Sequence, residues 1–183
     1  MKNNDVLRMF RYSLSIADNT MINIFKLAKC NIDKPQLLNL LKKEGDPDYV
    51  SCSTTLLERF FDGLIIYNRG SESDSSQLEE KPVDQGLYRR NEDSKPDRAL
   101  QDKNSSNIKP SESLSNNLIL KKIRIALDLK QDDMMEIFRL GNVALTKGEF
   151  SALFRKEGHK NYKECGDQYL KKFLQGLAVR HRM

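Results

Sequence analysis

The two ends of the chain are copies of one another. Residues 4–70 align with residues 117–183 at a constant offset of 113 positions, without a single gap. More than a quarter of the aligned positions are identical, and others exchange related side chains, such as Val6 for Ile119 and Arg8 for Lys121. Agreement over this length indicates a tandem duplication. The sequence therefore predicts two units of one fold.

The segment between the copies has a different composition. Ten of the 46 residues in 71–116 are Ser, three of the five Pro of the chain fall here, and only eight residues are apolar. So little apolar surface cannot offset the entropy that is lost when such a segment becomes ordered. The sequence therefore predicts a disordered linker over 71–116 between helical repeats at 1–70 and 117–183.

Within each copy the apolar residues recur at helical spacing, and no strand-like alternation occurs. Four short helices are predicted in each repeat, which makes the chain all-α. The third helix begins at a capping residue and stops at a glycine, and the second covers about 19–29 in the first repeat. In the first repeat, Asp33 and Gly45 mark the two ends of the third helix. The apolar faces of the first and fourth helices are formed by Leu7, Phe10, Leu14, Leu57, Phe60, Phe61 and Leu64.

Two pairs of equivalent residues carry further predictions. Asn4 and Asn117 stand where they would cap the first helix. Gly63 and Gly176 lie in the middle of the fourth helix, where glycine lowers helix stability by about 1 kcal/mol relative to alanine. That cost predicts that the fourth helix crosses another helix closely at this glycine.

Composition excludes several classes of protein. No apolar run approaches the roughly 18 residues of a membrane-spanning helix. The N-terminal segment is interrupted by charged residues and therefore does not have the apolar stretch of a secretory signal. Three unevenly spaced Cys are too few for a disulfide framework, so a cytoplasmic location is expected. The net charge of +5 divides into +2 on 1–70, −3 on 71–116 and +6 on 117–183. A polyanion should therefore bind mainly at the second repeat.

Residues for catalysis or metal binding are scarce. The two histidines, His159 and His181, both belong to the second repeat, and the cysteines lack the spacing of a zinc site. The sequence contains no Gly-rich phosphate loop and suggests no Cys–His or Ser–His–Asp arrangement. We expect neither an enzyme nor a metal or other cofactor.

Arg11 and Arg124 share a helical face with apolar residues, and Glu44 and Glu157 also occur in both copies. One interpretation is a partly buried, bidentate ion pair between Arg11 and Glu44 and another between Arg124 and Glu157. The other interpretation is that these arginines bind an anion.

The second and third helices resemble a helix-turn-helix in the spacing of their apolar residues, although Leu27 and Asn31 stand where the motif has small residues. In that motif the third helix would read nucleic acid. Its polar residues are Lys34, Gln36, Asn39, Lys42 and Lys43 in the first repeat and Lys147, Ser151, Arg155 and Lys156 in the second. Any helical hairpin with an apolar core can produce the same spacing, so this nucleic-acid site is a hypothesis.

The loop before the fourth helix is alike in both copies and carries Tyr49 and Cys52, or Tyr162 and Cys165. Either the tyrosines pack and hold the fourth helix in place, or the two loops form a paired binding surface. The cysteines are interpreted first as core residues. A redox role would require their Cα atoms to lie within about 7 Å of each other.

Four segments of the second repeat, each with a counterpart in the first, form a specific pattern: 117–124, 151–156, 161–168 and 173–177. This pattern resembles the YehS-like bacterial family of tandem-repeat domains of unknown function. The resemblance covers both repeats and implies a bacterial, cytoplasmic protein of duplicated helical domains. This chain departs from the family in its linker, which is longer than is usual. It implies no activity, so it transfers no catalytic residue.

Two functions are therefore hypotheses. The first is a non-enzymatic binding protein whose two similar repeats form one surface that contacts nucleic acid through the third helices. The second is a protein-interaction or regulatory adaptor that uses the tyrosine-containing loops and the fourth helix. Neither hypothesis involves a membrane or fixes an oligomeric state.

Overall fold

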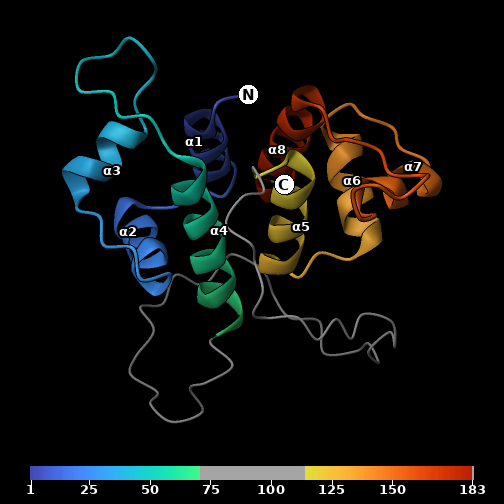
Figure 1. The fold of residues 1–183 in the computed structure, drawn as a ribbon, viewed down its shortest axis with the longest axis horizontal. Coiled ribbons are helices and arrows are strands. Elements are labelled where there is room, and N and C mark those ends of the chain that lie inside the picture. Colours follow the sequence, from blue (N-terminus) through green and yellow to red (C-terminus); the bar gives the residue numbers. More distant parts are fainter. Residues whose placement is uncertain (71–113, 183) are drawn as a thin grey trace.

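The computed structural model describes residues 1–70 and 114–182, which contain eight helices and no strand (Figure 1). The first repeat forms α1 Asn3–Ser13, α2 Asp18–Leu27, α3 Lys34–Leu40 and α4 Thr54–Arg69. The second forms α5 Asn116–Ala126, α6 Gln131–Leu140, α7 Lys147–Leu153 and α8 Asp167–Arg182. The prediction of an all-α fold with two four-helix repeats is thus confirmed. The predicted linker lies outside the described residues, apart from its last three positions, of which 114 and 115 precede α5 and Asn116 is the first residue of α5.

The third helix of each repeat begins at the predicted capping residue, Asp33 or Thr146, and each of these residues forms a capping box. Asp33 Oδ1 accepts a hydrogen bond from the backbone N–H of Gln36 at 2.7 Å, and Gln36 Oε1 accepts one from the N–H of Asp33 at 3.0 Å. Thr146 and Glu149 make the equivalent bonds of 3.2 and 3.1 Å in α7. These reciprocal bonds satisfy backbone donors that the start of a helix leaves unpaired.

Both third helices end several residues before the glycine that was predicted to end them. The last carbonyl groups of α3 accept hydrogen bonds from outside the helix: the N–H of Val50 donates to Asn39 at 3.2 Å, and the Asn4 side chain donates to Leu40 at 2.9 Å. The loop thus satisfies carbonyls that another helical turn would otherwise satisfy. The equivalent carbonyls in α7 accept from equivalent donors, Lys163 to Ala152 and Asn117 to Leu153.

The fourth helix crosses the second at a glycine in each repeat. A Cβ atom on Gly63 of α4 would lie 1.9 Å from the carbonyl oxygen of Ile24 in α2. A Cβ atom on Gly176 of α8 would lie 1.9 Å from the carbonyl oxygen of Ile137 in α6. Only glycine allows the two backbones to approach so closely. The predicted close crossing is therefore confirmed, and it is the same in both repeats.

The repeats pack against each other through their first and fourth helices. α1 lies along α8, and α4 lies along α5, so the first helix of each repeat pairs with the fourth helix of the other. The second and third helices of the two repeats lie outside this central group, toward opposite ends of the molecule (Figure 1). The arrangement resembles a twofold-symmetric dimer that is built from one chain.

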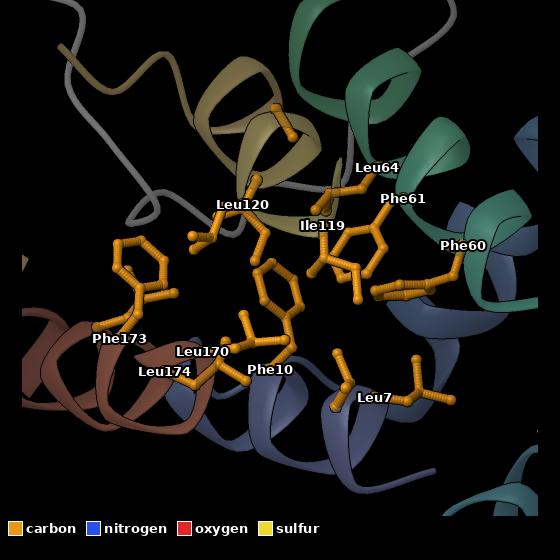
Figure 2. Packing of buried hydrophobic residues seen from close by; sticks show 14 of the residues in the cluster. Leu7, Phe10, Phe60, Phe61, Leu64, Ile119, Leu120, Leu170, Phe173 and Leu174 are labelled. Atoms are coloured by element: carbon orange, nitrogen blue, oxygen red, sulfur yellow. The ribbon is translucent and has the colours of Figure 1, made fainter. Parts of the chain in front are cut away.

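Side chains from all four central helices meet in one apolar core (Figure 2). The ring of Phe10 in α1 lies 5.4 Å, centroid to centroid, from that of Phe61 in α4, in an edge-to-face arrangement. Ile119 of α5 and Leu174 of α8 contribute to the same cluster of buried residues. The core is therefore continuous between the repeats, and neither repeat closes it alone.

Polar contacts across the helix pairs also occur at equivalent positions. The guanidinium carbon of Arg182 lies 4.3 Å from the ring centroid of Tyr12, and Arg69 Nη1 donates to the carbonyl of Ile125 at 3.5 Å. Arg182 is the counterpart of Arg69, and Ile125 is the counterpart of Tyr12.

None of the helices in the described ranges is long and apolar enough to cross a membrane.

Candidate nucleic-acid interface

A buried asparagine fixes the loop that follows the third helix. In the first repeat, Asn4 Nδ2 donates to the carbonyls of Leu40 at 2.9 Å and Val50 at 2.8 Å. Its Oδ1 accepts from the N–H of Cys52 and from the Tyr49 hydroxyl, both at 2.9 Å. The side-chain amide thus makes all four hydrogen bonds that its two donor hydrogens and two lone pairs allow.

Asn117 makes the same four bonds in the second repeat, to Leu153, Lys163, Cys165 and Tyr162. The prediction that Asn4 and Asn117 cap a helix is wrong. The N-cap positions are Lys2 in α1 and Ser115 in α5, and each asparagine lies in the first turn with its side chain buried. The tyrosine hydroxyl in each loop is bonded to this asparagine, which accounts for the likeness of the two loops.

Cys52 and Cys165 lie buried where these loops meet the core. Burial raises the pKa of the Cys52 thiol to about 11 and that of the Cys165 thiol to about 12. A thiol that stays protonated near neutral pH is a poor nucleophile and a poor redox group. The third cysteine, Cys30, is half-buried, and all three are free thiols.

The predicted ion pair between Arg11 and Glu44 is not formed, because the two side chains are engaged at opposite ends of α1. Arg11, at the C-terminal end, pairs with Asp18 at the start of α2 at 2.5 Å. Glu44 pairs instead with Lys2, which precedes α1. The helix separates the two residues that the sequence suggested as partners.

The second predicted pair, between Arg124 and Glu157, is likewise absent from the described residues. The guanidinium carbon of Arg124 lies 5.3 Å from the ring centroid of Phe154. What Arg124 and Arg11 share is a hydrogen bond from Nε to the turn before the second helix, at 3.2 Å to Leu129 and 3.1 Å to Ile16. Both arginines therefore stabilise the same turn, and only the partner of the guanidinium tip differs.

The polar residues predicted to read nucleic acid in the first repeat lie on α3 and at the start of its loop. They are Lys34, Gln36 and Lys43, which are exposed, and Asn39 and Lys42, which are half-buried. Lys34 Nζ lies 3.7 Å from a carboxylate oxygen of Asp18, and Lys42 Nζ lies 3.2 Å from one of Asp48. Gln36 belongs to the capping box. Neighbouring acids therefore neutralise part of this surface.

In the second repeat the equivalent residues are Lys147, Ser151 and Lys156, which are exposed, and Arg155, which is half-buried. The loop after α7 adds exposed Lys160 and half-buried Lys163. Lys163 pairs with Glu149 at 3.3 Å, but within 1–70 and 114–182 no ion pair involves Lys147, Lys156 or Lys160. We name these six residues of α7 and its loop the basic end.

Lys160 and Lys163 were not among the predicted site residues. The signal that identifies them is the difference between the copies, because Pro47 and Val50 occupy the equivalent positions in the first repeat. The residues that the two repeats share hold the fold. The exposed residues in which the repeats differ mark a surface that one repeat has acquired or lost.

The connection between the second and third helices is longer than in a helix-turn-helix. Six residues separate the helices in each repeat, 28–33 and 141–146, whereas the motif has three or four. α3 and α7 also lie at opposite ends of the molecule (Figure 1). The expectation of one surface that contains both third helices is therefore wrong, because the central helices separate them.

The described residues contain no group of three His, Cys, Asp or Glu side chains that could hold a metal ion. Among the shallow grooves of the described residues are two that no histidine lines. One runs along α6 and the connection to α7, where Asp133 and Glu136 pair with Arg180. The other lies between the end of α2 and the start of α4, beside Cys30 and Arg59.

Comparison with known proteins places this architecture in a family. Residues 3–70 and 116–182 each match the family described as "Protein of unknown function (DUF1456)". The chain is 31% identical to the uncharacterized protein YehS of Escherichia coli K12 over 183 residues, which cover 100% of this chain and 98% of that protein. No solved structure matches the chain. The two family matches coincide with the two helical repeats, and the chain therefore belongs to the DUF1456 family.

Proposed function

We propose that the chain is a non-enzymatic protein that binds nucleic acid through the basic end of its second repeat. The observation that carries this proposal is the exposure of Lys147, Lys156 and Lys160 on α7 and its loop, without ion-pair partners in the described part of the chain. Cations of this kind release counterions when they contact phosphates, which drives nucleic-acid binding.

The geometry of the basic end supports contacts to a phosphate backbone more than reading of bases. α7 has only seven residues, so only a few side chains of its exposed face could enter a groove of a nucleic-acid duplex. Lys163 is held by Glu149, and that hydrogen bond raises the pKa of Lys163 while the carboxylate offsets part of its charge. We expect binding with weak sequence preference and a strong dependence on salt.

The test is a salt titration of binding to mixed-sequence duplex DNA, single-stranded DNA and RNA. The double variant Lys156→Gln/Lys160→Gln should lose about tenfold in affinity near 50 mM salt, and the slope of log affinity against log salt should fall by about two. The matched control is Lys26→Gln/Lys121→Gln, which removes two exposed lysines outside the basic end. Equal losses in both variants, or wild-type binding without a salt slope, would contradict the proposal.

A gain-of-function variant sharpens this test. Pro47→Lys/Val50→Lys transfers two positive charges of the basic end to the equivalent positions of the first repeat. The backbone of the two loops is held by the same asparagine bonds, so the transferred lysines should be presented similarly. We expect the variant to bind nucleic acid more tightly than the wild type and with a steeper salt slope.

A protein partner at the opposite end is a second candidate, favoured by a specific observation. Leu38 of α3 is 41% exposed and Val50 of the following loop is 47% exposed. The N–H of Val50 bonds to the carbonyl of Asn39, the residue after Leu38, so both residues belong to the same end of the first repeat. In the second repeat the equivalent residues are Ser151 and Lys163, so this apolar surface is particular to the first repeat.

The adaptor hypothesis also named the fourth helices, but α4 and α8 are each packed between two other helices. Exposed Leu38 and Val50 therefore offer the better surface for a partner. Affinity capture from a nuclease-treated lysate, with Leu38→Ser/Val50→Lys as control, tests this candidate. A protein that the wild type captures and the variant does not would support it, and identical captured proteins would contradict it.

A further inference from the structure

The interface between the repeats poses a problem of specificity. Because the first helix of each repeat pairs with the fourth helix of the other, the two contact surfaces are nearly equivalent. The same surfaces could in principle join two first repeats or two second repeats from different chains. Charged residues that differ between the repeats can decide which pairing forms.

Such residues occur where α5 meets α4. Lys122 of α5 is a buried lysine, with a side chain that is only 9% exposed. Its ammonium group bonds to the carboxylate of Asp62 and lies 3.5 Å from the carboxylate of Glu58, both on α4. This cluster joins α4 of the first repeat to α5 of the second, and none of its three residues belongs to the basic end.

The equivalent positions where α1 meets α8 carry different side chains. Met9 takes the place of Lys122, and Lys171 and Gln175 take the places of Glu58 and Asp62. Two first repeats would place Met9 opposite two carboxylates that have no cation. Two second repeats would place Lys122 opposite Lys171, which has the same charge. Only the pairing of unlike repeats gives Lys122 its two carboxylates.

We propose that the cluster of Lys122, Glu58 and Asp62 selects the pairing of a first repeat with a second repeat, and that a second copy of this chain can supply either partner. A pair of two first repeats would leave the carboxylates of α4 without a cation, and a pair of two second repeats would place two lysines opposite each other. Both arrangements are costly in an interface. The 46 residues from 70 to 115 can span at most about 150 Å, so the covalent connection permits exchange between two chains.

The experiment reverses the charges in two full-length chains and mixes them. Lys122→Glu places three acids together, and Glu58→Lys/Asp62→Lys places three bases together. Each variant alone should unfold at least about 5 °C below the wild type. In the mixture, each first repeat finds a complementary second repeat on the other chain, so a 1:1 complex with exchanged repeats should form and regain most of that loss.

Native mass spectrometry of chains with different isotope labels measures this complex. The reference is wild-type chain mixed with its own labelled form, in which pairing within one chain is favoured by the high effective concentration. Lys121→Glu, an exposed neighbour on the same helix, controls for the change in net charge. The triple variant Glu58→Lys/Asp62→Lys/Lys122→Glu should restore a stable chain with internal pairing.

Three results would overturn the proposal. The first is that Lys122→Glu and Lys121→Glu have equal unfolding midpoints. The second is that the mixture contains no more 1:1 complex than the wild-type reference. The third is that the triple variant is as unstable as the single variant, which would mean that packing rather than charge decides the effect. The triple variant keeps the test decisive even where a single variant does not fold.

Discussion

Asn4 and Asn117 make the same four hydrogen bonds in the two repeats, whereas the loops that they hold differ in charge and polarity. Asp46, Asp48 and the exposed Val50 in the first loop are replaced by a histidine, an asparagine and a lysine in the second. The interior contacts and the helix crossings are shared, and the outer surfaces are not. The comparison shows that one backbone framework presents two different surfaces at its ends.

Substitution of the crossing glycines should give the largest effect and tests whether the two interiors are equivalent. Gly63→Ala and Gly176→Ala each force a Cβ atom onto a backbone carbonyl, so each should lower the free energy of unfolding by about 3 kcal/mol. Urea unfolding measures both. Gly148→Ala in α7 is the control, because apart from its own helix backbone and chain neighbours no atom lies closer than 4.0 Å to its Cβ position. An effect at only one crossing would show that the repeats have diverged inside as well.

Removal of the buried asparagine should give the next largest effect. Asn4→Ala leaves the N–H of Cys52 and the carbonyls of Leu40 and Val50 without their partner, which predicts a loss of about 2–3 kcal/mol. Asn117→Ala should cost the same amount in the second repeat. Hydrogen exchange of the amide at residue 52 or 165 reports which loop has opened. The exposed Asn23→Ala should change neither stability nor exchange.

The two arginines separate what the repeats share from what they do not. Arg11→Ala and Arg124→Ala should each cost about 1 kcal/mol, since each loses a hydrogen bond to the same turn. Arg11 also loses an ion pair with Asp18, so its effect should shrink in 1 M salt. Arg124 loses its contact with Phe154 instead, and its effect should not change. The same salt response in both variants would contradict this distinction.

The smallest effect concerns pH. The Cys52 and Cys165 thiols have pKa values of about 11 and 12 in the folded chain, against an ordinary value of 9.0. Above pH 9 the unfolded chain releases these protons before the folded chain does, so stability is full below pH 9 and falls as pH rises toward 11 or 12. The double variant Cys52→Ala/Cys165→Ala should lose less stability between pH 8 and 9.5, by at most about 1 kcal/mol for each thiol. Identical pH profiles would contradict this prediction.

Much of the fold could be predicted because its determinants are local or duplicated. The capping box at Thr146, the apolar stripe around Phe60 and the glycine crossing at Gly63 each depend on residues that lie close together in sequence or recur 113 positions apart. Agreement between the copies distinguished these positions from chance. The spacing of apolar side chains was sufficient for the number and order of the helices.

The partners of polar side chains could not be predicted in the same way. Arg11 and Glu44 recur together in both copies, but α1 separates them, and only the tertiary structure shows that Asp18 is closer. Asn4 has the sequence position of a cap, and its true role depends on a loop more than 35 residues away. The sequence prediction included only part of the basic end, because Lys160 stands at a position where the two repeats differ and is not marked by agreement between them.

The pairing of α1 with α8 has a consequence for how the chain folds. The Ser13 hydroxyl bonds to the carbonyl of Leu174, 161 positions later in the sequence, so the central core closes only after nearly the whole chain is available. Helical proteins usually fold fast because their contacts are local, and folding slows as the mean sequence separation of contacts rises. We therefore expect this all-helical protein to fold with the slower kinetics of a β-sheet protein, and to complete its core only when α8 has left the ribosome.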